Sequence, residues 1–314
     1  MYKENKIAVV VPVYNEENLI GETLYGIPKY IDKVYVIDDC STDETPKIIK
    51  KFANKDSRIV YIRHEKNKGV GAAIVSGYKK ALEDGIDIAA VMAGDNQMDP
   101  EELPKLLDPI IEGRADYTKG NRLFGYEYVR NMSRFRYTGN IALTFLTKMA
   151  SGYWHLMDPQ NGYTAISKKC LETINLDSIY PGFGYPNDLL VKLNFHSFRV
   201  LDVSIPARYG REKSHIKYRK YIVKVAWLLL KDFFWRLKWK YLALSFHPLV
   251  FFYIVGILLL FMGFFGGLYS LYYKFVLGRS LFIRGVLSLL FFIIGVQMFL
   301  FAMLFDMQEE RRNG

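Results

Sequence analysis

The sequence predicts an α/β fold in which a mostly parallel sheet carries helices on both faces, followed by an amphipathic membrane-interface segment and two transmembrane helices. Strand-like and helical patterns alternate through most of the N-terminal part, an order that is typical of parallel sheets. A basic segment rich in aromatic residues comes next, at residues 206–247. Two long apolar runs follow it, at residues 249–273 and 285–305.

Short apolar or alternating runs mark the expected strands. They lie at residues 7–11, 33–37, 59–63, 86–92, 116–119, 163–167 and 198–203. Segments with the apolar spacing of a helix alternate with the first several of these strands. In the helix that begins near residue 100, Leu103, Leu106 and Leu107 follow this spacing. Asp99 is its expected N-cap, with Pro100 in the first turn.

The glycines near residue 70 do not form a nucleotide-binding fingerprint. "KGVGAA" contains Gly69 and Gly71, but the sequence has no GxGxxG motif and no Walker loop. We expect these two glycines to let a helix pack closely on the sheet. An ordinary NAD or ATP site is therefore not expected.

The two apolar runs are each long enough to cross about 30 Å of hydrocarbon, so we expect two transmembrane helices in the cell membrane. The residues before the first strand include no apolar stretch long enough for a signal peptide, so the N-terminal domain is expected to be cytosolic. Cys40 and Cys170 are too few and too far apart for a disulfide framework or a zinc cluster. This agrees with a reducing compartment.

The net charge of +10 is concentrated next to the first apolar run. Residues 206–247 carry eleven Lys or Arg against two acidic residues, with three tryptophans between the charges. Such a segment fits a helix lying on an anionic membrane surface. Nucleic acid also binds basic patches, but the adjoining apolar run favours lipid, so we expect no nucleic-acid partner. A solvated basic helix stays open as the alternative.

Polar residues gather where the expected strands end. The first strand ends in "VPVYNEE", the second in "DDCSTD", the fourth in "AGDNQ" and the fifth in "GNR". In an open α/β sheet, ligands bind beyond the carboxyl ends of the strands. A ligand site is therefore expected at this edge.

Several of these segments, taken in order, resemble the family 2 glycosyltransferases with a GT-A fold. They are "VPVYNEE", "IDDCSTDET", "GDNQMDPEELPKLL", "KGNRL", "DPQNGYTAISK" and "RYGREKSH". The pair of apolar runs that follows is similar to the polyisoprenyl-phosphate branch of the family. The resemblance implies an inverting transfer of one sugar from a nucleoside-diphosphate sugar to a polyprenyl (dolichyl or undecaprenyl) phosphate at the cytosolic membrane face.

The resemblance also implies a donor site at the first strand tips. Pro12, Tyr14, Glu16 and Asp39 match positions that hold the base and ribose of the nucleotide. Carboxylates there can accept hydrogen bonds from base N–H or ribose O–H groups. The alternatives are strand-end packing for Pro12 and Tyr14 and a turn role for Asp39.

Asp95 and Gln97 match the metal-binding motif of the family, and Ala93 stands where a first aspartate would be. The resemblance implies a divalent cofactor, Mg²⁺ or Mn²⁺, that bridges the donor's diphosphate oxygens. One carboxylate can suffice, because Mg²⁺ keeps several waters and takes other ligands from the substrate. Asp99 is expected to cap its helix instead of binding the metal.

Arg122, Arg136 and Asn140 match the acceptor-phosphate site of related lipid-phosphate enzymes. Two guanidinium groups can hold phosphate oxygens bidentately. Arg208, Arg211, Lys213 and Ser214 resemble a basic loop of the family that closes over the donor's pyrophosphate. A solvated loop is the alternative for that segment.

The residues expected to act in catalysis are Asp95, Arg122, Arg136 and Asp158. A phosphate acceptor is already anionic and needs no general base, so catalysis would depend on positioning and electrostatic stabilisation. Asp158 is expected to orient the sugar or pair with lysines. Asp188 is expected to cap a helix or contact sugar hydroxyls.

We expect residues 1–215 to form the catalytic domain, 216–246 the interface segment, and 247–314 the two transmembrane helices with a short cytosolic tail. Two other functions stay open. A processive polysaccharide synthase is disfavoured, because "DFFWRLKWK" lacks the QxxRW motif of such enzymes. A catalytically silent, membrane-anchored protein that binds sugar nucleotides is suggested by Ala93. The sequence also leaves open whether the chain forms a homo-oligomer.

Overall fold

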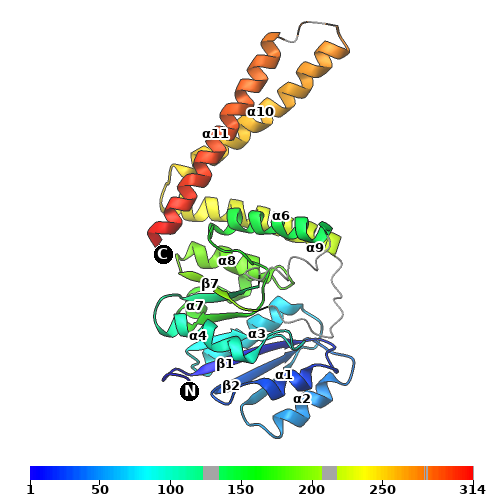
Figure 1. Cartoon of the computed structure of the whole chain (residues 1–314), viewed down its shortest axis with the longest axis vertical. Coiled ribbons are helices and arrows are strands. Elements are labelled where there is room, and N and C mark those ends of the chain that lie inside the picture. The colour runs from blue at the N-terminus through cyan, green and yellow to red at the C-terminus, as the bar shows by residue number, and fades with distance from the viewer. Residues whose placement is uncertain (123–133, 207–217, 279, 281, 314) are drawn as a thin grey trace. The chain divides into compact units, whose positions relative to one another are not determined.

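The computed structural model describes residues 1–122, 134–206, 218–278, 280 and 282–313, without the side chains of residues 134–137, 218–220 and 311–313. The chain forms two compact units, Met1–Phe233 and Phe234–Gly314. The first unit contains the sheet, and the second contains two long apolar helices (Figure 1). The predicted domain boundaries at residues 215 and 246 stay a prediction.

A seven-stranded sheet forms the centre of the first unit, in the order β3-β2-β1-β4-β6-β5-β7. The strands are β1 (Ile7–Val13), β2 (Lys33–Asp38), β3 (Ile59–Arg63), β4 (Ile88–Val91), β5 (Tyr117–Asn121), β6 (Thr164–Ser167) and β7 (Val200–Ser204). Neighbouring strands are parallel, except that β6 runs antiparallel to β4 and β5. Every predicted strand is present, and the prediction of a mostly parallel sheet is confirmed.

Helices cover both faces of this sheet. One face packs against α1 (Ile20–Gly26), α2 (Thr45–Ala53) and α4 (Leu103–Ile111), and the other against α3 (Val70–Glu83), α7 (Lys168–Thr173) and α8 (Tyr185–Phe195). In β1, Val9 lies in the core beneath α1, α2 and α4, and Val10 lies in the core beneath α3, α7 and α8; both are fully buried. A strand covered on both faces needs apolar side chains at successive positions, which explains the sequence of β1.

In its described residues, the first unit also contains the 3-10 turns η1 (Pro100–Glu102) and η2 (Leu176–Ser178) and the helices α6 (Arg134–Ser151) and α9 (Tyr218–Arg236), the last of which continues into the second unit. Along α9, Val225 and Leu229 are buried, whereas Val223, Trp227 and Leu230 are exposed. One side of α9 therefore packs on the first unit, and the other presents apolar side chains.

The predicted start of α4 is confirmed. Asp99 accepts a hydrogen bond from the backbone N–H of Glu101, with 3.1 Å between Oδ1 and N. Pro100 is the first residue of η1, which leads directly into α4. Leu103 and Leu106 then face the core.

The prediction for Gly69 and Gly71 is wrong about the neighbour. A Cβ on Gly71 would lie 2.3 Å from the backbone oxygen of Tyr180, and Gly69, which has φ +95°, lies against the same loop. These glycines make room for the loop before α8, not for the sheet. Helix α3 approaches the sheet through Gly77 instead, where a Cβ would lie 2.3 Å from a methyl carbon of Val10.

The second unit consists of the end of α9, a π-helical segment η3 (Leu237–Leu244), α10 (Leu249–Phe275) and α11 (Phe282–Asn313). Two stretches, Leu249–Phe275 and Phe282–Glu310, each contain an 18-residue segment with a mean hydropathy of 2.6 and 2.5 respectively, and both are long and apolar enough to cross a membrane. They pack closely, since a Cβ on Gly263 would lie 2.5 Å from the backbone nitrogen of Phe292. The two apolar helices expected from the sequence are present.

A buried ion pair connects the end of α9 to α11 within this unit. Arg236 donates from Nη1 to Oδ1 of Asp306 at 2.9 Å and from Nη2 to Oδ2 at 2.7 Å, and both side chains are fully buried. The Tyr241 hydroxyl donates to the same Oδ1 at 2.9 Å. Arg236 belongs to the basic segment at residues 206–247 that is expected on the membrane surface. For Arg236 this expectation is wrong, because its charge is neutralised by Asp306 inside the protein.

Candidate functional site

A cavity of about 240 Å³ lies at the edge of the sheet where the predicted ligand residues gather. Pro12 of β1, Asp95 and Gln97 after β4, and Arg122 after β5 all line it. Its other walls include residues 160–163, the loop and first turn of α8 with Phe183 and Tyr185, and Val70 and Ile74 of α3. The structure thus brings together predicted residues from three strand tips.

The loop after β4 places Asp95 and Gln97 side by side. The backbone N–H of Gln97 donates to Oδ1 of Asp95 at 3.2 Å, and the intervening Asn96 has φ +57°. Ala93 also lines the cavity, whereas Asp99 is not among its lining residues. Because the Asp99 side chain caps η1, the loop presents one carboxylate and one amide to the cavity.

This pair of side chains fits a weak site for a hard cation. The described residues include no group of three or more His, Cys, Asp or Glu placed to hold a metal. The Asp95 carboxylate and the Gln97 amide oxygen are ligands that Mg²⁺ accepts, and Mg²⁺ commonly takes its other ligands from waters and substrate phosphates. The cavity therefore suits a metal bound chiefly through a diphosphate.

Arg122 is held at the cavity wall by Asp158. Its Nε donates to Oδ2 of Asp158 at 2.8 Å and its Nη2 to Oδ1 at 3.2 Å. Burial alone would raise the pKa of Asp158, but the Arg122 charge and hydrogen bonds outweigh it and leave the pKa below its ordinary value. Asp158 is therefore an ionised partner that fixes the direction of the Arg122 fork.

Lys119 is hydrogen-bonded to the same wall of the cavity. This lysine is fully buried, and its Nζ donates to the backbone oxygens of Asp158 and of Asn161, the latter at 2.9 Å. Burial lowers the pKa of Lys119 to about 8, although the nearby Asp158 and Asp202 charges raise it. The wall formed by residues 158–161 is thereby fixed to β5, together with the Arg122 that follows that strand.

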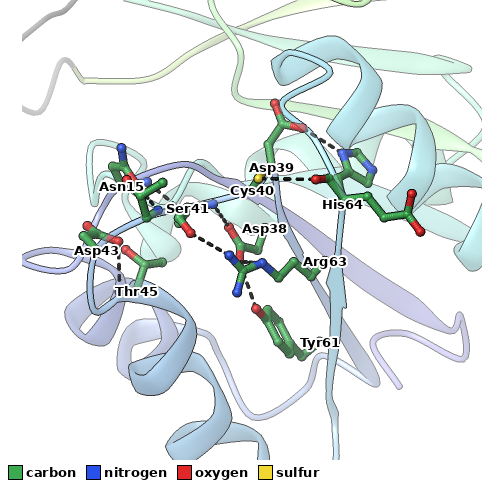
Figure 2. Close-up of polar contacts among 12 residues, drawn as sticks. Asn15, Asp38, Asp39, Cys40, Ser41, Asp43, Thr45, Tyr61, Arg63 and His64 are labelled. Carbon is green, nitrogen blue, oxygen red and sulfur yellow. Dashed lines mark hydrogen bonds and ion pairs between the residues drawn. The ribbon is translucent and has the colours of Figure 1, made fainter.

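A second polar cluster lies at the ends of β2 and β3 (Figure 2). Asp38 is fully buried and accepts hydrogen bonds from the backbone N–H of Ser41 and the hydroxyl of Tyr61, both at 2.8 Å. Arg63 also contacts Asp38, with 3.4 Å between Nε and Oδ2. Asp39 points to the other side of the strand end and contacts His64 at 2.7 Å.

The other predicted site residues either do not line this cavity or have side chains outside the description. Of the described residues that line the cavity, none is Tyr14, Glu16, Asp39 or Asn140. Tyr14 is exposed at the end of β1, and Asn140 lies in α6. The backbone of Arg136 also lies in α6, but its side chain is outside the description, and Arg208, Arg211, Lys213 and Ser214 lie outside the described residues altogether. The roles predicted for all of them stay predictions.

Asp188 has a structural environment. Its carboxylate accepts a hydrogen bond from the backbone N–H of Tyr180 at 2.7 Å and pairs with Lys192 one turn later in α8. It lies in the first turn of the helix, where a negative charge is favourable. The N-cap of α8 is Gly184, without a side-chain cap, so Asp188 supports the preceding loop and does not cap the helix.

Sequence reasoning missed Lys119, His64 and Arg63. A signal existed for Lys119, since it interrupts a strand whose five positions are all buried, and a lysine there needs hydrogen-bond partners. Arg63 ends the half-buried strand β3 and His64 follows it, and the sequence gives no sign that they meet the aspartates at the end of the neighbouring strand.

Comparison with known proteins identifies the family. Residues 8–174 match the model of Glycosyl transferase family 2, which covers more than half of the chain. The chain belongs to this family, and it is a glycosyltransferase.

Its relatives include enzymes named for lipid phosphates. It is 34% identical, over 54% of its length and 72% of the relative, to UDP-N-acetylglucosamine–dolichyl-phosphate N-acetylglucosaminyltransferase of Methanococcus voltae. It is 31% identical, over 63% of its length and 75% of the relative, to polyprenol monophosphomannose synthase of Mycolicibacterium smegmatis. Dolichol-phosphate mannosyltransferase of Pyrococcus furiosus is 27% identical over 65% of this chain and 56% of that protein.

Solved structures support the fold. Glucosyl-3-phosphoglycerate synthase from Mycobacterium tuberculosis aligns with a TM-score of 0.55 at 19% identity, covering 74% of this chain and 80% of the other. The GT-A fold expected from the resemblance is confirmed.

Proposed function

We propose that this glycosyltransferase moves a single sugar from a nucleoside-diphosphate sugar to a polyprenyl phosphate, with inversion at the sugar's anomeric carbon. The names of the three relatives each specify a dolichyl, dolichol or polyprenol phosphate, which supports this acceptor class. The processive and silent alternatives have no comparable support.

One observation carries the proposal: Asp95, Gln97 and Arg122 line the same cavity. Asp95 and Gln97 suit the diphosphate end of a donor with its metal, and a guanidinium suits the phosphate of an acceptor. A divalent ion bound there would neutralise the charge that develops on the departing nucleoside diphosphate. Donor and acceptor phosphates can therefore meet in one cavity.

The protein's contribution to the reaction is positioning. An acceptor phosphate oxygen forms the new bond to the anomeric carbon while the bond to the donor diphosphate breaks, and the bonding electrons leave with the diphosphate. The attacking oxygen carries no proton that must be removed, so no general base is needed. Asp158, ionised and bonded to Arg122, suits the task of orienting that cation rather than accepting a proton.

The two apolar helices and the exposed apolar side of α9 support a location at the membrane, where a polyprenyl phosphate resides. We place the first unit on the cytosolic face, with Leu249–Phe275 and Phe282–Glu310 crossing the bilayer. Basic residues near α9 fit an anionic cytosolic leaflet.

The test is a transfer assay with the detergent-solubilised full chain, divalent metal, a panel of nucleotide sugars and either dolichyl or undecaprenyl phosphate. We expect a lipid-linked monosaccharide from one donor, with the anomeric configuration opposite to that of the donor by NMR. A product of retained configuration would refute inversion. A lengthening glycan would support the processive alternative.

A further inference from the structure

A chain of three polar side chains lies behind the predicted base-binding aspartate. Asp39 follows β2, His64 follows β3, and Ser76 lies in α3. His64 contacts Oδ1 of Asp39 through Nδ1 at 2.7 Å and the Ser76 hydroxyl through Nε2 at 2.9 Å. Asp39 and His64 are both almost fully buried (Figure 2).

The hydrogen-bond pattern fixes the direction of the contact between His64 and Asp39. Oδ1 of Asp39 also accepts the backbone N–H of Lys68 at 2.8 Å, and Oδ2 accepts that of Gly69 at 2.7 Å. Because both oxygens of this carboxylate accept backbone N–H groups, the carboxylate is also the acceptor in its contact with His64. The proton of that contact therefore lies on Nδ1 of His64. Nε2 then faces Ser76, whose hydroxyl also lies 3.1 Å from the backbone oxygen of Ala72.

These contacts leave Asp39 little freedom. A carboxylate has about four lone-pair positions, and the described residues occupy two on Oδ1 and one on Oδ2. Only about 5% of the Asp39 side-chain surface is exposed. The carboxylate can therefore offer a ligand a single acceptor position on Oδ2, in a direction set by His64 and the two backbone groups.

We propose that His64 is a positioning residue for nucleotide recognition: it orients Asp39 so that Oδ2 accepts one N–H of the donor's base and thereby selects among bases. This inference rests on the proposed function, because it takes Asp39 as part of the donor site. Its content is the role of His64, which acts on the donor only through Asp39.

A purely structural role is the competing explanation, since the same contacts tie the ends of β2 and β3 to α3. Two substitutions separate the roles by geometry. The side-chain amide nitrogen of an asparagine can take the place of the histidine Nδ1, so His64→Asn keeps the donor to Asp39 and loses the contact with Ser76. A glutamine amide reaches the place of Nε2, so His64→Gln keeps Ser76 and loses the donor to Asp39.

The experiment measures, by calorimetry, the affinity of the full chain in detergent for UDP, GDP, CDP and ADP with divalent metal, and then kcat and KM for the preferred donor. For His64→Gln we expect the ratio between the preferred and least preferred nucleotide to fall about tenfold, the size expected for a lost hydrogen bond to a charged group. Donor KM should rise by a similar factor, with kcat at saturating donor nearly unchanged. For His64→Asn we expect the wild-type ratio.

Tyr61→Phe is the matched control. It also removes one hydrogen bond to a buried aspartate at the same strand ends, but that aspartate is Asp38. It should leave the base selectivity unchanged. Melting temperatures of all variants report any loss of folding.

Equal losses of affinity for all four nucleotides in His64→Gln, or identical selectivity in the two His64 variants, would overturn the positioning role. Unchanged binding in His64→Gln beside normal wild-type binding would also overturn it and leave the proposed function intact. If the wild type binds none of the four nucleotides, the proposed function fails as well.

Discussion

Arg122 and Asp158 illustrate how much a single contact decides about the site. Asp158 lies in a motif that also suits a catalytic aspartate, but its carboxylate is buried and makes two hydrogen bonds to the Arg122 side chain. A carboxylate in this position is well placed to orient the cation. We therefore interpret Asp158 as a positioning residue for the acceptor phosphate.

Asp158→Asn should raise the acceptor KM about tenfold, because the Arg122 fork loses its charged anchor, and should destabilise the fold by about 1–3 kcal/mol. The kcat at saturating acceptor should change little. Initial rates at varied acceptor concentration, beside melting curves, check this. A loss of kcat of about a thousandfold at an unchanged acceptor KM would instead show that Asp158 takes part in the chemistry.

At the scale of residues, the sequence predicts the side chains at strand tips but not their partners. Asp95, Gln97 and Arg122 follow strand ends, and they do line one cavity. Arg122 and Asp158 are 36 positions apart, and His64 and Asp39 are 25 apart. Such pairs depend on which strands become neighbours, and local sequence patterns do not contain that information.

The approach of a loop to α3 is the clearest constraint at the scale of elements. A Cβ on Gly71 would lie 2.3 Å from the backbone oxygen of Tyr180, and a backbone atom cannot move aside as a flexible side chain can. By contrast, the nearest atom to a Cβ on Gly21 in α1 would be 3.7 Å away. The two glycines have opposite consequences.

Gly71→Ala should destabilise the protein by about 1–3 kcal/mol through overpacking. Gly21→Ala should stabilise it by about 0.5 kcal/mol, because alanine loses less conformational entropy in a helix. Melting temperatures of the full chain in detergent give the comparison. Similar shifts in the two variants would show that the loop does not constrain α3.

The α8 and α9 helices carry a pH-dependent contribution to stability. Burial, together with the charge of Asp188, raises the pKa of Asp232 in α9 to about 7. An aspartate in the unfolded chain titrates near 4. Between about pH 4 and pH 7 the folded state therefore binds more protons than the unfolded state, and its stability falls as the pH rises through this window.

Asp232→Asn should accordingly raise the melting temperature at pH 8, where the wild-type carboxylate is charged, and have little effect at pH 5. The expected gain is on the order of 1 kcal/mol, reduced by solvent screening of a half-buried group. Melting curves at several pH values check the sign. A larger gain at pH 5 than at pH 8 would contradict the raised pKa.

At the scale of elements, the sequence predicts which strands and helices exist better than it predicts their directions and neighbours. All seven strands were expected, because each lies in a short apolar or alternating run. The antiparallel direction of β6 was not, since a strand's period is the same in both directions. The prediction of what packs against Gly69 and Gly71 was wrong for a related reason. A glycine indicates that another segment approaches closely, but it does not indicate which segment.

At the scale of the whole molecule, composition separates the chain into a mixed α/β part and an apolar C-terminal part, and the structure forms two units. The division into units lies within α9, after Phe233, and so inside the predicted interface segment. The buried pair of Arg236 and Asp306 was not predictable, because the sequence shows only a basic residue in a basic segment and an acid near the end of a helix.

The central claim is that one cavity receives both the donor diphosphate and the acceptor phosphate. The most direct test measures transfer of labelled sugar from the preferred nucleotide sugar to polyprenyl phosphate by the full chain, wild type beside Arg122→Lys. Lysine keeps a cation for Asp158 but loses the bidentate fork. We predict that the wild type forms lipid-linked sugar, and that Arg122→Lys keeps its donor affinity while its acceptor KM rises about tenfold. No lipid-linked sugar from any donor despite tight nucleotide-sugar binding, or an unchanged acceptor KM in Arg122→Lys, would contradict the claim.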